Sequence, residues 1–305
     1  MKQRTTLLLF LSCLLAAPVL AQAIGGGTCS SANLGGTYAV SITARQVTAS
    51  GTFTGVLQSN GTAAFDGQSS VTFKLVANTG EAPATPLTWS GTYSVQANCA
   101  GVINITSGGN ATWNVALYKT GTAQTAYPFL LSGSDANYTY SGSGDLQPAT
   151  ACSASTFSGV YTFTGTGFSL TGSAVSGVEN GAGLLQFDGV SALTANFTMW
   201  TAGAAPSTLV LTGSYSISAF CMGSATLTDA SNNSYVMSFS VYNDTVANAA
   251  SYVGLALGSK FLIAGNLHTA YGQPATAAMQ LPGSEPVLSV AAKPLAGSSS
   301  QGGRS

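Results

Sequence analysis

The sequence predicts an all-β protein built as two tandem antiparallel barrels of about eight strands each, with a β-sandwich as the alternative architecture. Three observations predict this class. Apolar and polar residues alternate along most of the chain, turn signals recur at short intervals, and one unit of about 120 residues occurs twice. Short antiparallel strands joined by tight turns favour a meandering up-and-down barrel.

Alternation marks the expected strands. It begins with Tyr38, Val40 and Ile42 and returns at Tyr161 and Phe163. Alternation places every second side chain on the same face, which is typical of a half-buried strand. The other strands expected in the first unit are Gly51–Gln58, Ser70–Val76, Leu87–Val95, Gly101–Thr106, Thr112–Tyr118, Tyr127–Leu131 and Tyr138–Ser141. Those of the second unit include Ala192–Trp200, Leu209–Ile217, Ser224–Leu227, Tyr235–Tyr242, Tyr252–Leu257 and Phe261–Ile263.

Clusters of Gly, Asn, Asp and Ser mark the turns between these strands. The predicted turns are Ser59-Asn60-Gly61, Asp66-Gly67, Gly108-Gly109-Asn110, Glu179-Asn180-Gly181 and Ser231-Asn232-Asn233. Asp66 and its counterpart Asp188 each precede a glycine, and Asp-Gly favours a hairpin turn because both residue types tolerate positive φ. A calcium or sugar contact is the alternative role for these two aspartates.

Four anchors carry the duplication. Cys29 with Gly36-Thr37-Tyr38 returns 123 residues later as Cys152 with Gly159-Val160-Tyr161. The other three anchors return after 122 residues: Phe65-Asp66-Gly67 as Phe187-Asp188-Gly189, Gly91-Thr92-Tyr93-Ser94-Val95 as Gly213-Ser214-Tyr215-Ser216-Ile217, and Cys99-Ala100-Gly101 as Cys221-Met222-Gly223. A unit of this length is a common size for an independent domain. The sequence therefore predicts one β-domain over residues 24–149 and its duplicate over residues 150–272.

The duplication also predicts the disulfides. Four cysteines follow the N-terminal segment, and they allow three pairings. Each unit holds one cysteine at its start and one in its middle, so pairing Cys29 with Cys99 and Cys152 with Cys221 makes each domain self-sufficient. A metal or redox role would require closer Cys or His spacing than this chain has.

Two resemblances follow from these motifs. The Gly-x-Tyr at the start of each unit is similar to the Gly-x-Trp opening of lipocalin- and avidin-like barrels, with Tyr in place of Trp, which implies a lipocalin-like meander. The full set of anchors resembles a repeat domain of uncharacterised secreted bacterial proteins. That family has no established activity, so the resemblance implies no catalytic or binding residues.

The two ends of the chain differ from the repeated units. Lys2 and Arg4 precede an apolar run from Leu7 to Leu20, and Ala21-Gln22-Ala23 supplies a small-x-small cleavage pattern. Residues 1–23 are therefore predicted to be a secretory signal peptide, and the mature protein is expected outside the cytoplasm, either extracellular, periplasmic or at the cell surface, with no membrane span. Residues 273–305, rich in Pro, Ala, Ser and Gly, are predicted to form a disordered tail.

The low charge of the chain limits its partners. Only 6% of the residues are charged, and eight are Lys or Arg. An ordinary globular domain has about 25% charged residues. With so few basic side chains, the chain lacks the positive surface that nucleic acid or anionic lipid requires.

No set of residues predicts catalysis, a metal site or a cofactor. The single histidine, His268, has no counterpart in the first unit, and no Gly-x-Ser-x-Gly motif accompanies it. Only Asp66 and Asp188 recur among the acids, and one recurring acid per unit does not make the carboxylate pair of a glycosidase. The sequence therefore predicts that the protein is not an enzyme.

Three tryptophans are the candidate ligand-binding residues. Trp89, Trp113 and Trp200 fall in expected strands but not at equivalent positions of the two units. They either line a binding site or pack in the cores. The leading functional hypothesis is a secreted or surface-bound binding or adhesion protein, with surface polysaccharide as a candidate partner. The alternatives are a carrier that holds a small apolar ligand inside its barrels and a structural surface or matrix protein.

Overall fold

The computed structural model describes residues 28–48, 53–78, 85–119, 125–171, 174–242, 250–257 and 261–269. The predicted signal peptide and tail lie outside these residues. The first half contains β1 (Gly36–Val47), β2 (Phe53–Phe65), β3 (Ser70–Asn78), β4 (Thr85–Val95), β5 (Ala100–Ser107), β6 (Ala111–Leu117), β7 (Phe129–Ser134) and β8 (Tyr138–Leu146). The second half contains β9 (Ser158–Thr171), β10 (Ala174–Asp188), β11 (Ala192–Thr201), β12 (Ser207–Ile217), β13 (Met222–Thr228), β14 (Ser234–Tyr242), β15 (Ala250–Leu257) and β16 (Phe261–Thr269).

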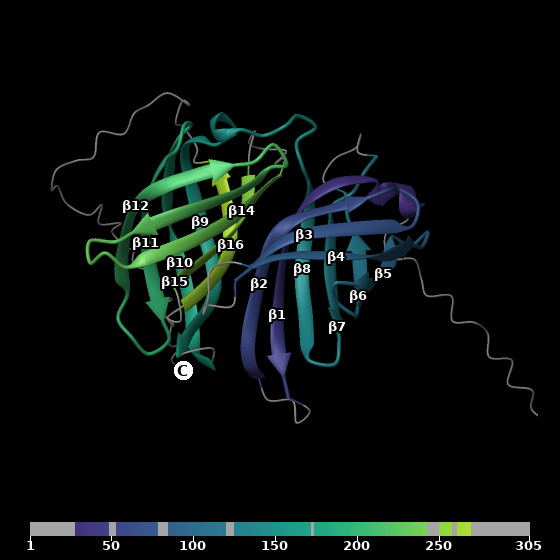
Figure 1. The fold of residues 1–305 in the computed structure, drawn as a ribbon. Helices are drawn as coiled ribbons and strands as arrows, with labels where there is room; N and C mark the ends of the chain where they lie inside the picture. Colours follow the sequence, from purple (N-terminus) through teal and green to yellow (C-terminus); the bar gives the residue numbers. More distant parts are fainter. Residues whose placement is uncertain are drawn as a thin grey trace, which may run out of the picture.

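Each half closes into an antiparallel barrel in which every strand pairs with the next one along the chain. β8 pairs with β1 and closes the first barrel, and β16 pairs with β9 and closes the second. Figure 1 shows the two barrels side by side. The predicted up-and-down barrels are confirmed, and the sandwich alternative does not apply. In the described part of the chain, no helix is long and apolar enough to cross a bilayer.

Two of the predicted turns are wrong. Ser59-Asn60-Gly61 lies inside β2, and Glu179-Asn180-Gly181 lies inside β10. Asn-Gly is a strong turn signal, but here the glycines serve close packing between strands. A Cβ at Gly61 would lie 2.1 Å from the carbonyl oxygen of Lys74 on β3, and one at Gly181 would lie 3.1 Å from the sulfur of Met199.

Both predicted disulfides are present, and each closes one end of its barrel. Cys29 is bonded to Cys99, and Cys152 to Cys221. Loops of about 70 residues closed in this way stabilise a fold by roughly 4 kcal/mol in the chain-entropy model. A short 3-10 helix lies at the same end of each barrel, η1 (Ser31–Leu34) in the first and η2 (Ala154–Thr156) in the second.

The tyrosine of the Gly-x-Tyr motif in β4 and β12 fastens these short helices. The hydroxyl of Tyr93 donates to the carbonyl oxygen of Ser31 at 3.2 Å, and that of Tyr215 donates to the carbonyl oxygens of Ala154 at 3.0 Å and Phe157 at 2.9 Å. One hydrogen bond of this kind contributes about 1 kcal/mol. The repeated motif therefore has a structural role in both barrels.

Aromatic rings fill the centre of each barrel. Phe65 lies among four rings whose centroids are 4.9 to 6.1 Å from its own, those of Tyr38, Phe73, Tyr93 and Phe129. Phe187 occupies the equivalent place in the second barrel, with Phe157, Tyr161, Tyr215 and Phe239 at 4.9 to 6.0 Å. Edge-to-face packing of this kind adds about 0.5–1.5 kcal/mol per pair beyond the burial of area.

The two barrels are packed against each other through their outer surfaces. The first barrel contributes β1, β2, Asn78 of β3 and Asp145 of β8, and the second contributes β14, β15, β10, β16 and β9. At the centre, the amide nitrogens of Asn60 and Asn78 donate to the carbonyl oxygen and the hydroxyl of Ser238, at 3.3 and 3.0 Å. The hydroxyl of Ser240 donates to the carbonyl oxygen of Val40 at 3.4 Å.

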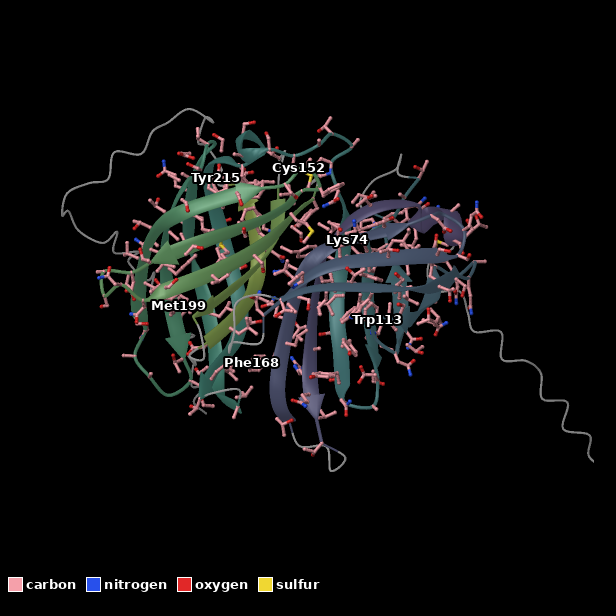
Figure 2. All side chains as sticks on the ribbon, in the orientation of Figure 1. Lys74, Trp113, Cys152, Phe168, Met199 and Tyr215 are labelled. Carbon is pink, nitrogen blue, oxygen red and sulfur yellow. A yellow bond between two sulfur atoms is a disulfide. The ribbon has the colours of Figure 1, made fainter. Side chains whose placement is uncertain are left out.

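Apolar side chains flank these hydrogen bonds. Tyr242 and Tyr252 pack on Ala39, while Val56 meets a second cluster that includes Leu262. Phe168, labelled at the junction in Figure 2, packs against this second cluster. Lys74, also labelled there, lies with its ammonium group 5.6 Å from the ring centroid of Phe220.

Candidate binding surface

The three tryptophans separate into two classes. Trp89 and Trp113 belong to the core of the first barrel, where Trp113 is fully buried with its ring 5.3 Å from Phe73 and 5.5 Å from Tyr140. Figure 2 shows Trp113 within the first barrel. Trp200 lies on the outside of β11 and is 41% exposed. Of the three sequence candidates, only Trp200 is placed to meet a partner.

Trp200 belongs to an outer face formed by β10, β11 and β12. It pairs in register with Asn180, and two rows further along the sheet Leu184, Asn196 and Val210 lie side by side across the three strands. Three apolar members besides Trp200 are 43 to 55% exposed, namely Leu184, Val178 and Val210. We name this surface the Trp200 face; it consists of Val178, Asn180, Ala182, Leu184, Asn196, Thr198, Trp200, Thr208 and Val210.

The Trp200 face carries no charged side chain. A contiguous group of exposed apolar residues with uncharged polar neighbours is typical of a surface that binds another molecule. Tryptophan is the residue type most often found at the energetic centre of such contacts.

The same positions of the first barrel are buried. The strand registers align β2 with β10 and β3 with β11, so that equivalent residues are 122 apart. The equivalent pairs are Val56 and Val178, Gln58 and Asn180, Asn60 and Ala182, Thr62 and Leu184, and Asn78 and Trp200. In the first barrel all five are buried, and Asn60 and Asn78 bond directly to the second barrel.

Asp66 and Asp188 organise loops. One carboxylate oxygen of Asp66 accepts hydrogen bonds from the backbone N–H groups of Gln68, Ser69 and Ser70 at 2.8 to 2.9 Å. Asp188 accepts from the three equivalent N–H groups at the same distances. These donors lower the pKa of Asp66 to about 2 and lower the pKa of Asp188. Both aspartates thus lie at turns, as predicted, and each carboxylate caps its loop by accepting the backbone N–H groups that follow it.

Glu179 is a buried carboxylate that the sequence did not indicate. The pattern Glu179-Asn180-Gly181 predicts a turn, but Glu179 lies on β10 with its side chain toward the barrel interior, and it is 7% exposed. The hydroxyls of Ser169 and Thr201 donate to it from the two neighbouring strands. The first barrel has Leu57 at the equivalent position. The pairing of β10 with β9 and β11 brings Glu179, Ser169 and Thr201 together. A turn predicted at Glu179 does not lead one to expect that pairing.

The remaining candidates for chemistry lie apart. His268 is exposed on β16, opposite Thr162 of β9. Within the described ranges, no three His, Cys, Asp or Glu side chains gather closely enough to hold a metal ion. The described interiors of both barrels are occupied by the aromatic and aliphatic cores, which weighs against the hypothesis of a small apolar ligand inside them.

Comparison with known proteins leaves the function to be argued from this geometry. No protein-family model matches the chain, and no curated protein matches it in sequence. The surface of the second barrel is therefore the strongest guide to function.

Proposed function

We propose that the protein is an extracellular, non-enzymatic binding protein and that the Trp200 face is its binding surface. The observation that carries this proposal is the exposure of Trp200, Leu184 and Val210 on one uncharged sheet face. Burying these side chains against a partner would release about 25 cal/mol for each Å² of apolar surface removed from water. The two disulfides are compatible with an oxidising compartment outside the cytoplasm.

The composition of the face indicates the chemistry of its partner. The indole ring offers a large flat apolar surface with one N–H donor, and Asn180 and Asn196 offer amide groups that both donate and accept hydrogen bonds. Thr198 and Thr208, which pair across β11 and β12, add two hydroxyl groups to the face. These groups suit an uncharged partner with both apolar and hydrogen-bonding groups, such as a polysaccharide chain or a protein surface of similar composition.

Retention of the protein on immobilised partners tests this proposal. The panel consists of cell-wall preparations, insoluble polysaccharides and the protein itself coupled to beads. We expect retention on at least one support, reduced about tenfold or more by Trp200→Ala because exposed tryptophans dominate such contacts. Thr226→Ala, an exposed position on β13 away from the face, is the matched control. Retention that is absent throughout, or unchanged by Trp200→Ala, contradicts the proposal.

A further inference from the structure

Three amide side chains of the first barrel lie together where the two barrels meet. Gln58 and Asn60 are on the outer side of β2, and Asn78 of β3 is paired in register with Gln58. Only 1 to 2% of each residue is exposed. The amide nitrogens of Asn60 and Asn78 donate to Ser238 of the second barrel. Two of the three amides therefore bind the second barrel directly.

The amide of Gln58 differs from the other two. Its nitrogen is buried, and no oxygen in the described part of the chain accepts a hydrogen bond from it. A buried donor that lacks an acceptor is costly, because it has given up its hydrogen bonds to water without replacement. Most buried polar groups in native proteins therefore have a partner, either in the protein or in an ordered water molecule.

Gln58 lines a small crevice between the two barrels. Val56 and Thr43 line it from the first barrel, and Thr166, Phe168 and Leu262 line it from the second; Phe168 is labelled at this junction in Figure 2. The volume open to the centre of a water molecule is about 10 Å³. That volume is sufficient for about one water molecule.

Two threonines bring hydroxyl groups to the crevice, one from each barrel. Thr43 is paired with Gln58 across β1 and β2, and Thr166 is paired with Ala264 across β9 and β16. A hydroxyl group can both donate and accept. With the Gln58 amide, the two hydroxyls offer about the three hydrogen bonds that a buried water molecule ordinarily makes. The residues that line the crevice carry no charge, so the site suits water better than an ion.

We propose that this crevice is a binding site for one ordered water molecule, which accepts from the Gln58 amide and bonds to the hydroxyls of Thr43 and Thr166. The water joins the two barrels at the amide that does not bind the second barrel directly. A hydrogen bond through such a water is nearly as favourable in enthalpy as a direct one. The site is independent of the proposed function, because no residue of the Trp200 face lines it.

The second barrel contains the counterpart of this pair of residues. Asn180 corresponds to Gln58 and Thr166 to Thr43, and the two are again paired in register. Asn180 is exposed, so solvent is available to its amide without a dedicated site. The duplication therefore supplies a matched control position, at which the same type of side chain is not enclosed.

A crystal structure of the full chain, determined at room temperature and at a resolution that shows ordered water, tests the site. We expect density for one water molecule about 2.7–3.2 Å from the Gln58 amide nitrogen, also bonded to Thr166 of the second barrel. In Gln58→Met, which nearly keeps the size of the side chain but removes the amide, this density should be lost. In the control Asn180→Leu, the crevice water should remain.

Four results would overturn the inference. They are a crevice without water density in the unsubstituted protein, a Gln58 amide that donates directly to a protein oxygen, a water bonded to the first barrel only, and a water that persists in Gln58→Met. The first three are observed in the unsubstituted protein, so they do not depend on the folding of a variant. None of the four contradicts binding at the Trp200 face, which retention on immobilised partners tests separately.

Discussion

The two barrels share the aromatic centre of their cores and differ on the outer side of β2 and β3 and their equivalents β10 and β11. Phe65 and Phe187 occupy the same central position, and both disulfides and both loop-capping aspartates superpose in register. On the outer side of these strands, however, Asn60 and Asn78 of the first barrel correspond to Ala182 and Trp200 of the second. The central positions around Phe65 and Phe187 tolerate little change because protein cores are close-packed. Outer positions are free to differ, so function is to be sought where the duplicates have diverged.

The largest expected effect tests the shared interior. Phe65→Ala and Phe187→Ala each leave a cavity among four packed rings, and we expect each to lower the free energy of unfolding by about 3–5 kcal/mol. Urea unfolding measures this loss. Equal losses confirm that the two cores are equivalent. If one substitution costs less than about 1 kcal/mol, the interiors differ more than their registers indicate.

An intermediate effect tests the difference between equivalent outer positions of β3 and β11. Asn78→Ala leaves the buried hydroxyl of Ser238 without the amide that donates to it, and we expect a loss of about 1–3 kcal/mol in the free energy of unfolding. Trp200→Ala at the equivalent position of a single chain should change stability by less than about 0.5 kcal/mol, because Trp200 is a surface residue that is 41% exposed. Both are measured by urea unfolding at a concentration at which the chains are separate. Equal effects would show that the two positions are in the same environment.

The sequence predicted the architecture better than the surface. Alternation is a local signal and the recurrence of the anchors can be read directly from the sequence, and together they were sufficient for the barrels and for the pairing of Cys29 with Cys99. The turn predicted at Ser59-Asn60-Gly61 was wrong because Gly61 is required by the close approach of β3, which no local pattern records. Trp200 could be aligned with Asn78 by the offset of 122, but only the structure shows that Asn78 is buried against the other barrel.

The smallest effect concerns the shared loops and depends on pH. Backbone N–H groups lower the pKa of Asp66 to about 2 from an ordinary value of 3.8, so the ionised carboxylate stabilises the folded state. That contribution is fully present above about pH 4 and is lost as the pH falls through about 2. Asp188, whose pKa is lowered by the equivalent donors, contributes with the same sign. We therefore expect the free energy of unfolding to decline between pH 4 and pH 2, and the decline to be smaller in the Asp66→Asn and Asp188→Asn variants and smallest in the double variant. Urea unfolding at both pH values measures the difference. If the double variant declines as steeply as the unsubstituted protein, the acid sensitivity belongs to other groups, and the two loops contribute nothing to it.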